Sequence, residues 1–171
     1  MEEYVGTKFK TIFLQREIPV IDNSNKIISI AKRLSKYFPN NAGNISIRTK
    51  QGFIITATGS DLTNLKADDL VEVTNVNIKH KEIVVNGTKE PSSESFLHNA
   101  VYQARPEINA IIHGHGTIKG NIPTTRHFQP YGSIELMKEV LNILENNNII
   151  IIKDHGFLSL GKTIEDATPD F

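Results

Sequence analysis

The chain has 171 residues, of which 39% are hydrophobic and 22% are charged, a length that suits one domain with a hydrophobic core and is short for two. Nineteen basic residues balance nineteen acidic ones, so the net charge of zero gives no reason to expect a nucleic-acid or membrane-surface partner. The absence of cysteine excludes disulfides and thiolate metal sites. With no secretion signal and no apolar run long enough to span a bilayer, we expect a soluble cytoplasmic protein with a single domain over residues 1–171.

Residues 1–20 form an N-terminal extension to which the sequence assigns no role. A helix is expected next, because Asp22 and Ser24 both suit an N-cap and apolar residues follow at helical spacing as far as Phe38. Short strands then follow, joined by turn residues and interrupted by one helical turn that opens at Thr58-Gly59. We expect these strands at 45–48, 53–58, 70–74 and 82–85.

The second half of the chain alternates helices with apolar strands. One helix is expected from Pro91-Ser92-Ser93 to Arg105 and another from Ser133 onward, with an irregular stretch at 117–131 between the strand at 110–112 and the second helix. The four isoleucines at 149–152 suit a strand covered on both faces, as in the centre of a sheet. The pattern predicts a three-layer α/β/α sandwich around a mixed, largely antiparallel sheet.

Two histidines separated by one glycine follow the apolar run at 110–112. Residues i and i+2 of a strand point to the same face, about 6.6 Å apart, so His113 and His115 can reach one metal ion. The alternative is that one ring packs in the core and the other is solvated. The apolar run at 149–152 also leads into a His-Gly pair, so His155 is a candidate third ligand. Three neutral imidazoles with an open fourth position suit a catalytic zinc site.

Glu94 lies at the start of the helix that leads into the histidine strand. A carboxylate near a helix N-terminus is stabilised by the free amides and the dipole, which is sufficient reason for a glutamate there. The alternative is a general base or acid beside the metal. His98 falls on the same helical face, which is compatible with a polar wall.

Three short stretches combine a small residue with a hydroxyl or amide at an expected loop: Gly43-Asn44, Thr58-Gly59 and Ser92-Ser93. The last two lie at expected helix starts, where free backbone N–H groups attract anions. Capping and turn chemistry alone would also explain such residues. If the three stretches converge, they make a phosphate cradle that needs few basic side chains.

The chain resembles the class II aldolase/adducin family, and within it the L-fuculose-phosphate aldolase branch. The matching pieces occur in the family's order and cover most of residues 22–161. They are Ala42-Gly43-Asn44-Ile45-Ser46, Thr56-Ala57-Thr58-Gly59, Pro91-Ser92-Ser93-Glu94, Tyr102-Gln103-Ala104-Arg105-Pro106, Ala110 to His115, Gly132-Ser133-Ile134-Glu135-Leu136 and Asp154-His155-Gly156.

This resemblance implies an aldolase that cleaves or forms a carbon–carbon bond in a small sugar phosphate or hydroxyketone phosphate through a zinc-stabilised enediolate. It implies that Zn²⁺, or another divalent transition metal, is held by His113, His115 and His155 and that Glu94 is catalytic. It further implies phosphate contacts from Gly43, Asn44, Thr58, Gly59, Ser92 and Ser93. The glutamate after Pro-Ser-Ser is more similar to the aldolases than to the sugar-phosphate 4-epimerases. A homo-oligomer, by resemblance a tetramer, is also implied.

The sequence departs from the family pattern in two places. Family members generally carry a further helix and strand between the His-x-His strand and the segment at Ile122-Pro123, with a tyrosine acid, and long helices after the third histidine. We therefore expect a chain shortened at both places, with Tyr131 as a candidate substitute acid. The alternatives are an adducin-like, non-catalytic oligomerisation module, and an epimerase or dehydratase that uses the same metal site.

Overall fold

A computed structural model describes residues 5–20 and 24–169. Its centre is one eight-stranded sheet with the strand order β1-β5-β4-β3-β2-β6-β8-β7. The strands are β1 (Lys10–Gln15), β2 (Gly43–Arg48), β3 (Phe53–Thr56), β4 (Leu70–Asn77), β5 (Glu82–Asn86), β6 (Ala110–Gly114), β7 (Ile149–Ile152) and β8 (Gly156–Gly161). The helices are α1 (Ser24–Arg33), α2 (Ser95–Ala104) and α3 (Ile134–Leu144), with 3-10 turns at Ser35–Tyr37, Pro39–Asn41 and Ala67–Asp69. None of these helices is both long and apolar enough to cross a bilayer.

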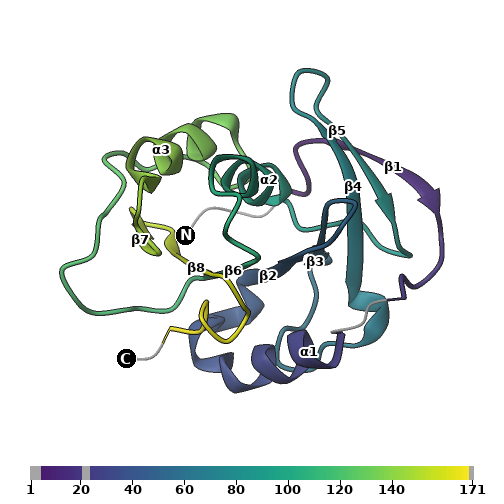
Figure 1. Ribbon diagram of the computed structural model, residues 1–171, viewed down its shortest axis with the longest axis horizontal. Coiled ribbons are helices and arrows are strands. Elements are labelled where there is room, and N and C mark those ends of the chain that lie inside the picture. The colour runs from purple at the N-terminus through teal and green to yellow at the C-terminus, as the bar shows by residue number, and fades with distance from the viewer. Residues whose placement is uncertain (1–4, 21–23, 170–171) are drawn as a thin grey trace.

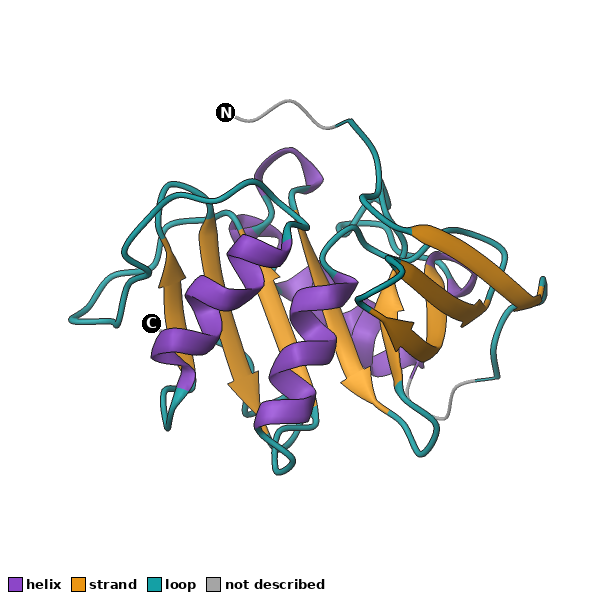
Figure 2. Cartoon of the chain, turned by 90° about the horizontal axis from the view of Figure 1, so that it is seen from above, coloured by secondary structure: helices purple, strands orange, loops and turns teal. Residues whose placement is uncertain are grey.

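Helices α2 and α3 cover one face of the sheet, and α1 covers the other (Figures 1 and 2). The side chains of β6 alternate between two cores: Ile111 packs in the cluster shared with α2 and α3, whereas Ala110 and Ile112 pack in the cluster shared with α1. All pairings between the strands are antiparallel except that of β1 with β5. The expected three-layer α/β/α sandwich around a mixed, largely antiparallel sheet is confirmed.

The isoleucine strand β7 lies at the edge of the sheet, so its expected central position is wrong. Strand β8, which the sequence did not predict, lies between β7 and β6 and supplies the neighbour on the inner side. On the outer side the chain after β6 covers part of the edge: Ile151 N donates to Pro123 O, and Thr125 N donates to Ile151 O. The run of four apolar residues is therefore explained because helices cover one face of β7 and the other face is partly buried.

Several other boundaries differ from the predicted ones. Part of the N-terminal extension forms β1, and the expected α1 stops at Arg33 before two 3-10 turns. Helix α2 begins at Ser95 rather than at Pro91, because Pro91 makes an isolated bridge with Ala57. Residues 58–65 form turns rather than a helix. The candidate cap Asp22 lies outside the described residues.

Candidate functional site

The three candidate ligands meet at one end of the sheet. His113 is in β6, His115 follows it, and His155 precedes β8, the antiparallel neighbour of β6. Their ring centroids lie 4.6–5.1 Å apart, and one nitrogen from each ring lies within 4.8 Å of the others. The prediction that two distant strand ends bring these imidazoles together therefore agrees with the structure.

His113 presents a nitrogen lone pair to this cluster. The ring is fully buried, and its Nδ1 lies 2.8 Å from the carbonyl oxygen of Phe157, which can only accept, so Nδ1 carries the proton. In the neutral ring Nε2 is then unprotonated, and it has no hydrogen-bond partner. A metal ion would satisfy this buried nitrogen, and a backbone carbonyl that fixes the ring is a common support for a histidine ligand. The donor set thus fits a divalent transition metal.

The side chain of Glu94 faces the histidines instead of capping α2. Glu94 occupies the N-cap position, yet its carboxylate makes no hydrogen bond to a helix amide. Its Oε1 lies 3.0 Å from Nε2 of His155, and its Oε2 lies 3.0 Å from Nε2 of His113, without hydrogen-bond geometry in the second case. Asn44 Nδ2 donates to Oε2 at 3.2 Å. Glu94 therefore makes no capping hydrogen bond, and its carboxylate lies beside two of the candidate ligands.

Burial controls the charge state of the cluster. Desolvation lowers the pKa of His113 and lowers the pKa of His115 to about 3, so these rings are neutral at neutral pH. Burial alone would raise the pKa of Glu94, but the neighbouring imidazoles of His113 and His155 outweigh it and hold this pKa below its ordinary value. The site therefore combines the neutral imidazoles of His113 and His115 with an ionised carboxylate.

A buried histidine outside the ligand set should make the fold sensitive to mild acid. Burial lowers the pKa of His98 from 6.5 to about 3, although Glu94 nearby acts in the opposite direction. The unfolded chain binds this proton and the folded chain does not, so stability is lost as the pH falls from about 6.5 toward about 3. We expect urea unfolding of the metal-free protein to show a lower free energy of unfolding at about pH 5 than at about pH 7.

Two histidine variants check the origin of this slope. His98→Gln should make the pH dependence shallower without abolishing it, because the buried His113 and His115 rings act in the same direction. His127→Gln, which replaces a histidine whose side chain is 63% exposed, is the control variant. Equal slopes in the wild type and in His98→Gln would contradict the assignment.

Two of the three stretches of the expected cradle lie next to Glu94, and the third lies beside the segment that leads to it. Ser92 N donates to Thr56 O and Thr58 N donates to Glu90 O, which sets the turn at Thr58-Gly59 beside Glu90. The contact between Asn44 and Glu94 places Gly43-Asn44 next to this carboxylate. The expected helix start at Thr58-Gly59 is wrong, because this stretch forms a turn. Ser92 Oγ accepts a hydrogen bond from Glu94 N in the turn before α2. The hydrogen-bonding capacity of this hydroxyl is therefore partly used within the protein.

Gly43 and Gly59 offer a matched pair for testing local geometry. Gly43 has φ +142°, and a Cβ there would lie 2.5 Å from His113 O and 2.7 Å from the Phe38 ring. Gly59 has φ +71°, and a Cβ there would meet nothing within 4 Å. We expect Gly43→Ala to destabilise the fold by roughly 2–5 kcal/mol, from backbone strain together with overpacking. Gly59→Ala should cost only roughly 1–2 kcal/mol, from backbone strain alone.

Chemical denaturation of the two variants and the wild type measures this difference. Because Gly43 pairs with Gly114 in β6, the clash in Gly43→Ala would displace the histidine strand itself. Comparable losses in both variants would show that close packing at Gly43 is not the decisive cost.

A hollow of about 300 Å³ adjoins two of the histidines. His115 and His155 line it, together with residues 116–118, 151–152, 154 and 156–157. None of the cradle residues Gly43, Asn44, Ser92 and Ser93 lines it. The hollow therefore gives access to two of the three rings, but it does not join the candidate phosphate-binding stretches.

Sequence reasoning missed two polar residues beneath the site, Ser46 and Tyr102. Both hydroxyls are buried and lie 2.7 Å apart, and Nδ1 of His98 lies 2.7 Å from Ser46 Oγ. Their spacing was a usable signal: Ser46 follows Asn44 by two residues on a strand, and Tyr102 follows His98 by four on a helix.

Tyr131, the candidate substitute acid, lies against the N-terminal segment. Its hydroxyl accepts from Val5 N at 2.7 Å and donates to Gly6 O at 3.2 Å, and Lys8 Nζ lies 4.3 Å from its ring centroid. The observed contacts give the hydroxyl a structural role in holding the chain before β1.

Comparisons with known proteins agree with this arrangement. The profile of the Class II Aldolase and Adducin N-terminal domain family matches residues 25–120. The L-fuculose phosphate aldolase of Methanocaldococcus jannaschii is 31% identical over 167 residues, with 85% of this chain and 87% of that protein covered. That of Haemophilus influenzae is 30% identical over 167 residues, with 84% and 74% covered. A solved structure of an L-fuculose 1-phosphate aldolase has a TM-score of 0.74 and 25% identity, covering 88% of this chain and 80% of that one.

Proposed function

The chain belongs to the class II aldolase and adducin family, and from this premise we propose that it is a metal-dependent aldolase of a small sugar phosphate. The observation that carries the proposal is the cluster of three histidine nitrogens with the Glu94 carboxylate against two of them. An assembly module without chemistry has no need for a buried, unpartnered nitrogen at His113 or for a carboxylate beside it.

His113, His115 and His155 would hold the ion, and their nitrogen-only donor set suits zinc or another divalent transition metal. When bound, such an ion would supply Lewis-acid stabilisation of the charge that develops on the substrate oxygens as the carbon–carbon bond breaks. The Phe157 carbonyl contributes by fixing the His113 ring in the orientation that faces the other two imidazoles.

Glu94 is the group that moves the proton. Its carboxylate is ionised at neutral pH, so it can accept a proton at Oε1 or Oε2 and return it in the reverse step. Asn44 restrains this carboxylate by donating to Oε2, and the surrounding apolar packing keeps bulk water from competing with it.

The substrate class follows from the cradle together with the relatives. The stretches Gly43-Asn44, Thr58-Gly59 and Ser92-Ser93 would contact the phosphate through small polar side chains and through backbone amides other than Thr58 N and Ser92 N, which already donate to backbone carbonyls. Ser92-Ser93 precedes the N-terminus of α2. Amides of this kind hold a phosphate group without requiring lysine or arginine. We therefore propose a phosphorylated ketose or hydroxyketone, oriented by its phosphate so that the bond to be cleaved lies near Glu94.

The test is to incubate the zinc-reconstituted protein with a panel of ketose 1-phosphates that includes L-fuculose 1-phosphate. We expect release of dihydroxyacetone phosphate, detected by its enzymatic reduction with NADH. His113→Ala serves as the control, because it removes one proposed ligand. Turnover no greater than in this control, in protein shown to contain zinc, would refute the aldolase proposal.

Product analysis distinguishes the alternatives. An epimerase would convert the substrate to another sugar phosphate without releasing dihydroxyacetone phosphate, and a dehydratase would release water and leave the carbon chain intact. An adducin-like module would bind no stoichiometric metal and would keep its oligomeric state in His155→Ala. The tetramer implied by resemblance stays a prediction, which light scattering of the purified chain can test.

A further inference from the structure

A buried row of polar side chains runs from Glu94 along the contact between β2 and α2. We call it the polar ladder and define it as Asn44, Ser46 and Arg48 on β2 with Glu94, His98 and Tyr102 at the start of and along α2. Two residues along a strand span about 6.7 Å, and four residues along a helix span about 6 Å. Every second residue of β2 can therefore face every fourth residue of α2, which gives three successive pairs. Asn44 meets Glu94, Ser46 meets His98 and Tyr102, and Arg48 meets Tyr102.

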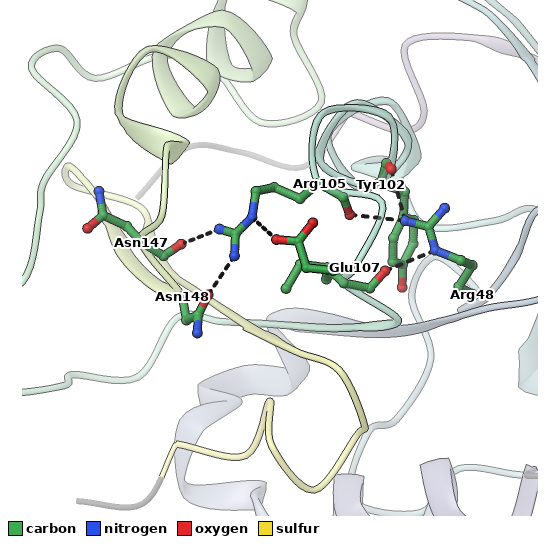
Figure 3. A network of polar contacts seen from close by, with 7 residues as sticks. Arg48, Tyr102, Arg105, Glu107, Asn147 and Asn148 are labelled. Atoms are coloured by element: carbon green, nitrogen blue, oxygen red, sulfur yellow. Dashed lines mark hydrogen bonds and ion pairs between the residues drawn. The ribbon is translucent and has the colours of Figure 1, made fainter.

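Arg48 holds the far end of the ladder. Its Nη2 donates to the carbonyl oxygens of Tyr102 and Arg105, its Nε donates to that of Ile108, and its guanidinium lies 4.6 Å from the centre of the Tyr102 ring (Figure 3). The bond to Tyr102 O satisfies one of the last carbonyls of α2, and the other two bonds go to the C-cap Arg105 and to Ile108 beyond the helix. Arg48 thereby holds Tyr102 with its hydroxyl against Ser46. The opposite end of the polar ladder lies at the candidate site.

Counting protons along the ladder decides the tautomer of His98. If Nδ1 accepts from Ser46, then Tyr102 donates to Ser46 and every hydroxyl proton has an acceptor. If Nδ1 instead donates to Ser46, one of the two hydroxyl protons, that of Ser46 or that of Tyr102, has no acceptor among the described residues. Both residues are buried, so an unmatched donor on either is unfavourable. The first arrangement places the remaining ring proton on Nε2.

The two unpartnered atoms of the ladder agree with this assignment. Nε2 of His98 and Oδ1 of Asn44 are both buried, and both lack a hydrogen-bond partner. Asn44 already directs its amide nitrogen toward Glu94, so its Oδ1 requires a donor. Among the described residues no hydrogen bond joins these two atoms. A protonated Nε2 is still favoured, because its N–H lies in the field of the Glu94 carboxylate, which would repel the lone pair of a bare Nε2.

We propose that His98, held as its Nε2–H tautomer by Ser46 and Tyr102, is a positioning residue that stabilises and orients Glu94 together with Asn44. The role in turnover rests on the proposed function, whereas the tautomer does not. In this arrangement Tyr102 O–H donates to Ser46 Oγ, and Ser46 O–H donates to His98 Nδ1. The remaining proton of the His98 ring is then on Nε2, the nitrogen that does not contact Ser46. No bond to carbon is made or broken in the ladder, and His98 does not contact substrate.

The first arm of the test is nitrogen-15 NMR of the histidine rings in the full, metal-free chain at neutral pH. His98→Gln identifies the His98 signals. We expect a protonated Nε2 and an unprotonated Nδ1 in the wild type, and a mixture of tautomers in Ser46→Ala. Tyr102→Phe, which keeps the ring under Arg48, should shift the tautomer in the same direction and serves if Ser46→Ala does not fold.

The second arm measures turnover of the metal-loaded protein. Ser46→Ala should lower kcat by roughly 10–100-fold while KM and metal content stay unchanged, as expected for loss of an outer support of a reacting group. Ser159→Ala is the matched control, since Ser159 is equally buried in β8 and lies outside the ladder. A wild-type His98 with its proton on Nδ1, or a Ser46→Ala protein with unchanged kcat, overturns the proposal. A protein without aldolase activity would defeat the proposed function, but the NMR arm would still decide the tautomer.

Discussion

Replacing His113 by glutamine should abolish tight metal binding. His113 is the most buried of the three candidate ligands, and the Phe157 carbonyl fixes the orientation of its ring. Loss of a support to a ligand already lowers metal affinity by 10–100-fold, so loss of the ligand itself should cost roughly 100-fold or more. Competition with a chromophoric chelator and elemental analysis measure this change directly.

Thermal unfolding supplies a second readout that does not depend on activity. An ion that binds only the folded state adds about 2.7 kcal/mol of stability when its free concentration is 100 times Kd. We expect zinc to stabilise the wild type by an amount of this order and to have almost no effect on His113→Gln. In the metal-free state His113→Gln should be the less stable protein, because it also loses the Nδ1 donor to Phe157 O, so the comparison is made on the zinc-induced shift within each protein.

The exposed His127 provides the control for nonspecific binding to histidine. His127→Gln should retain wild-type affinity, since the His127 side chain is 63% exposed and pairs with Glu139 outside the site. A folded wild-type chain that takes up no stoichiometric metal would contradict the proposed centre.

Glu94→Gln should leave the metal bound and remove turnover. Glutamine has the shape of glutamate and can still accept from Asn44, but it cannot take up a proton. Since a positioned base contributes roughly 10²–10⁴-fold, we expect kcat to fall by a factor in that range while the metal content stays near that of the wild type. Steady-state kinetics on the best substrate of the panel, with metal content measured on the same samples, checks both expectations.

Glu139→Gln is a matched control for this substitution. Glu139 also lies 3.0 Å from a histidine nitrogen, but this pair is on the surface and away from the cradle. It should keep wild-type kcat. If Glu94→Gln turned over as fast as the wild type, the proton would have to be moved by another group, and the role of Glu94 would be reduced to positioning.

Residue patterns in the sequence predicted most of the framework. Strand alternation at β2, the hairpin to β3 and the apolar stripe of α3 are local properties of the chain, and the structure contains all three. The boundary of α2 was wrong because the bridge between Ala57 and Pro91 holds the preceding residues outside the helix, and that pairing joins segments distant in sequence.

Strand β8 was missed for a similar reason. Gly156–Gly161 is short and glycine-bounded, and it becomes a strand because it pairs on both sides, with β6 and with β7. Its omission also explains the wrong central position given to β7. Strand β1 was missed because its mixed sequence is ordered by parallel pairing with β5 rather than by its own pattern.

By itself, the sequence determined which residue types were available for chemistry: three histidines at strand ends, one glutamate before a helix, and small polar residues at three loops. The i, i+2 geometry of a strand already placed His113 and His115 on one face. Tertiary structure alone decided that His155 reaches them, because the pairing of β6 with β8 sets the strand ends together. It also decided that Glu94 turns toward the imidazoles and that Ser46, His98 and Tyr102 share hydrogen bonds, since such contacts depend on the register between β2 and α2, and no local propensity encodes that register.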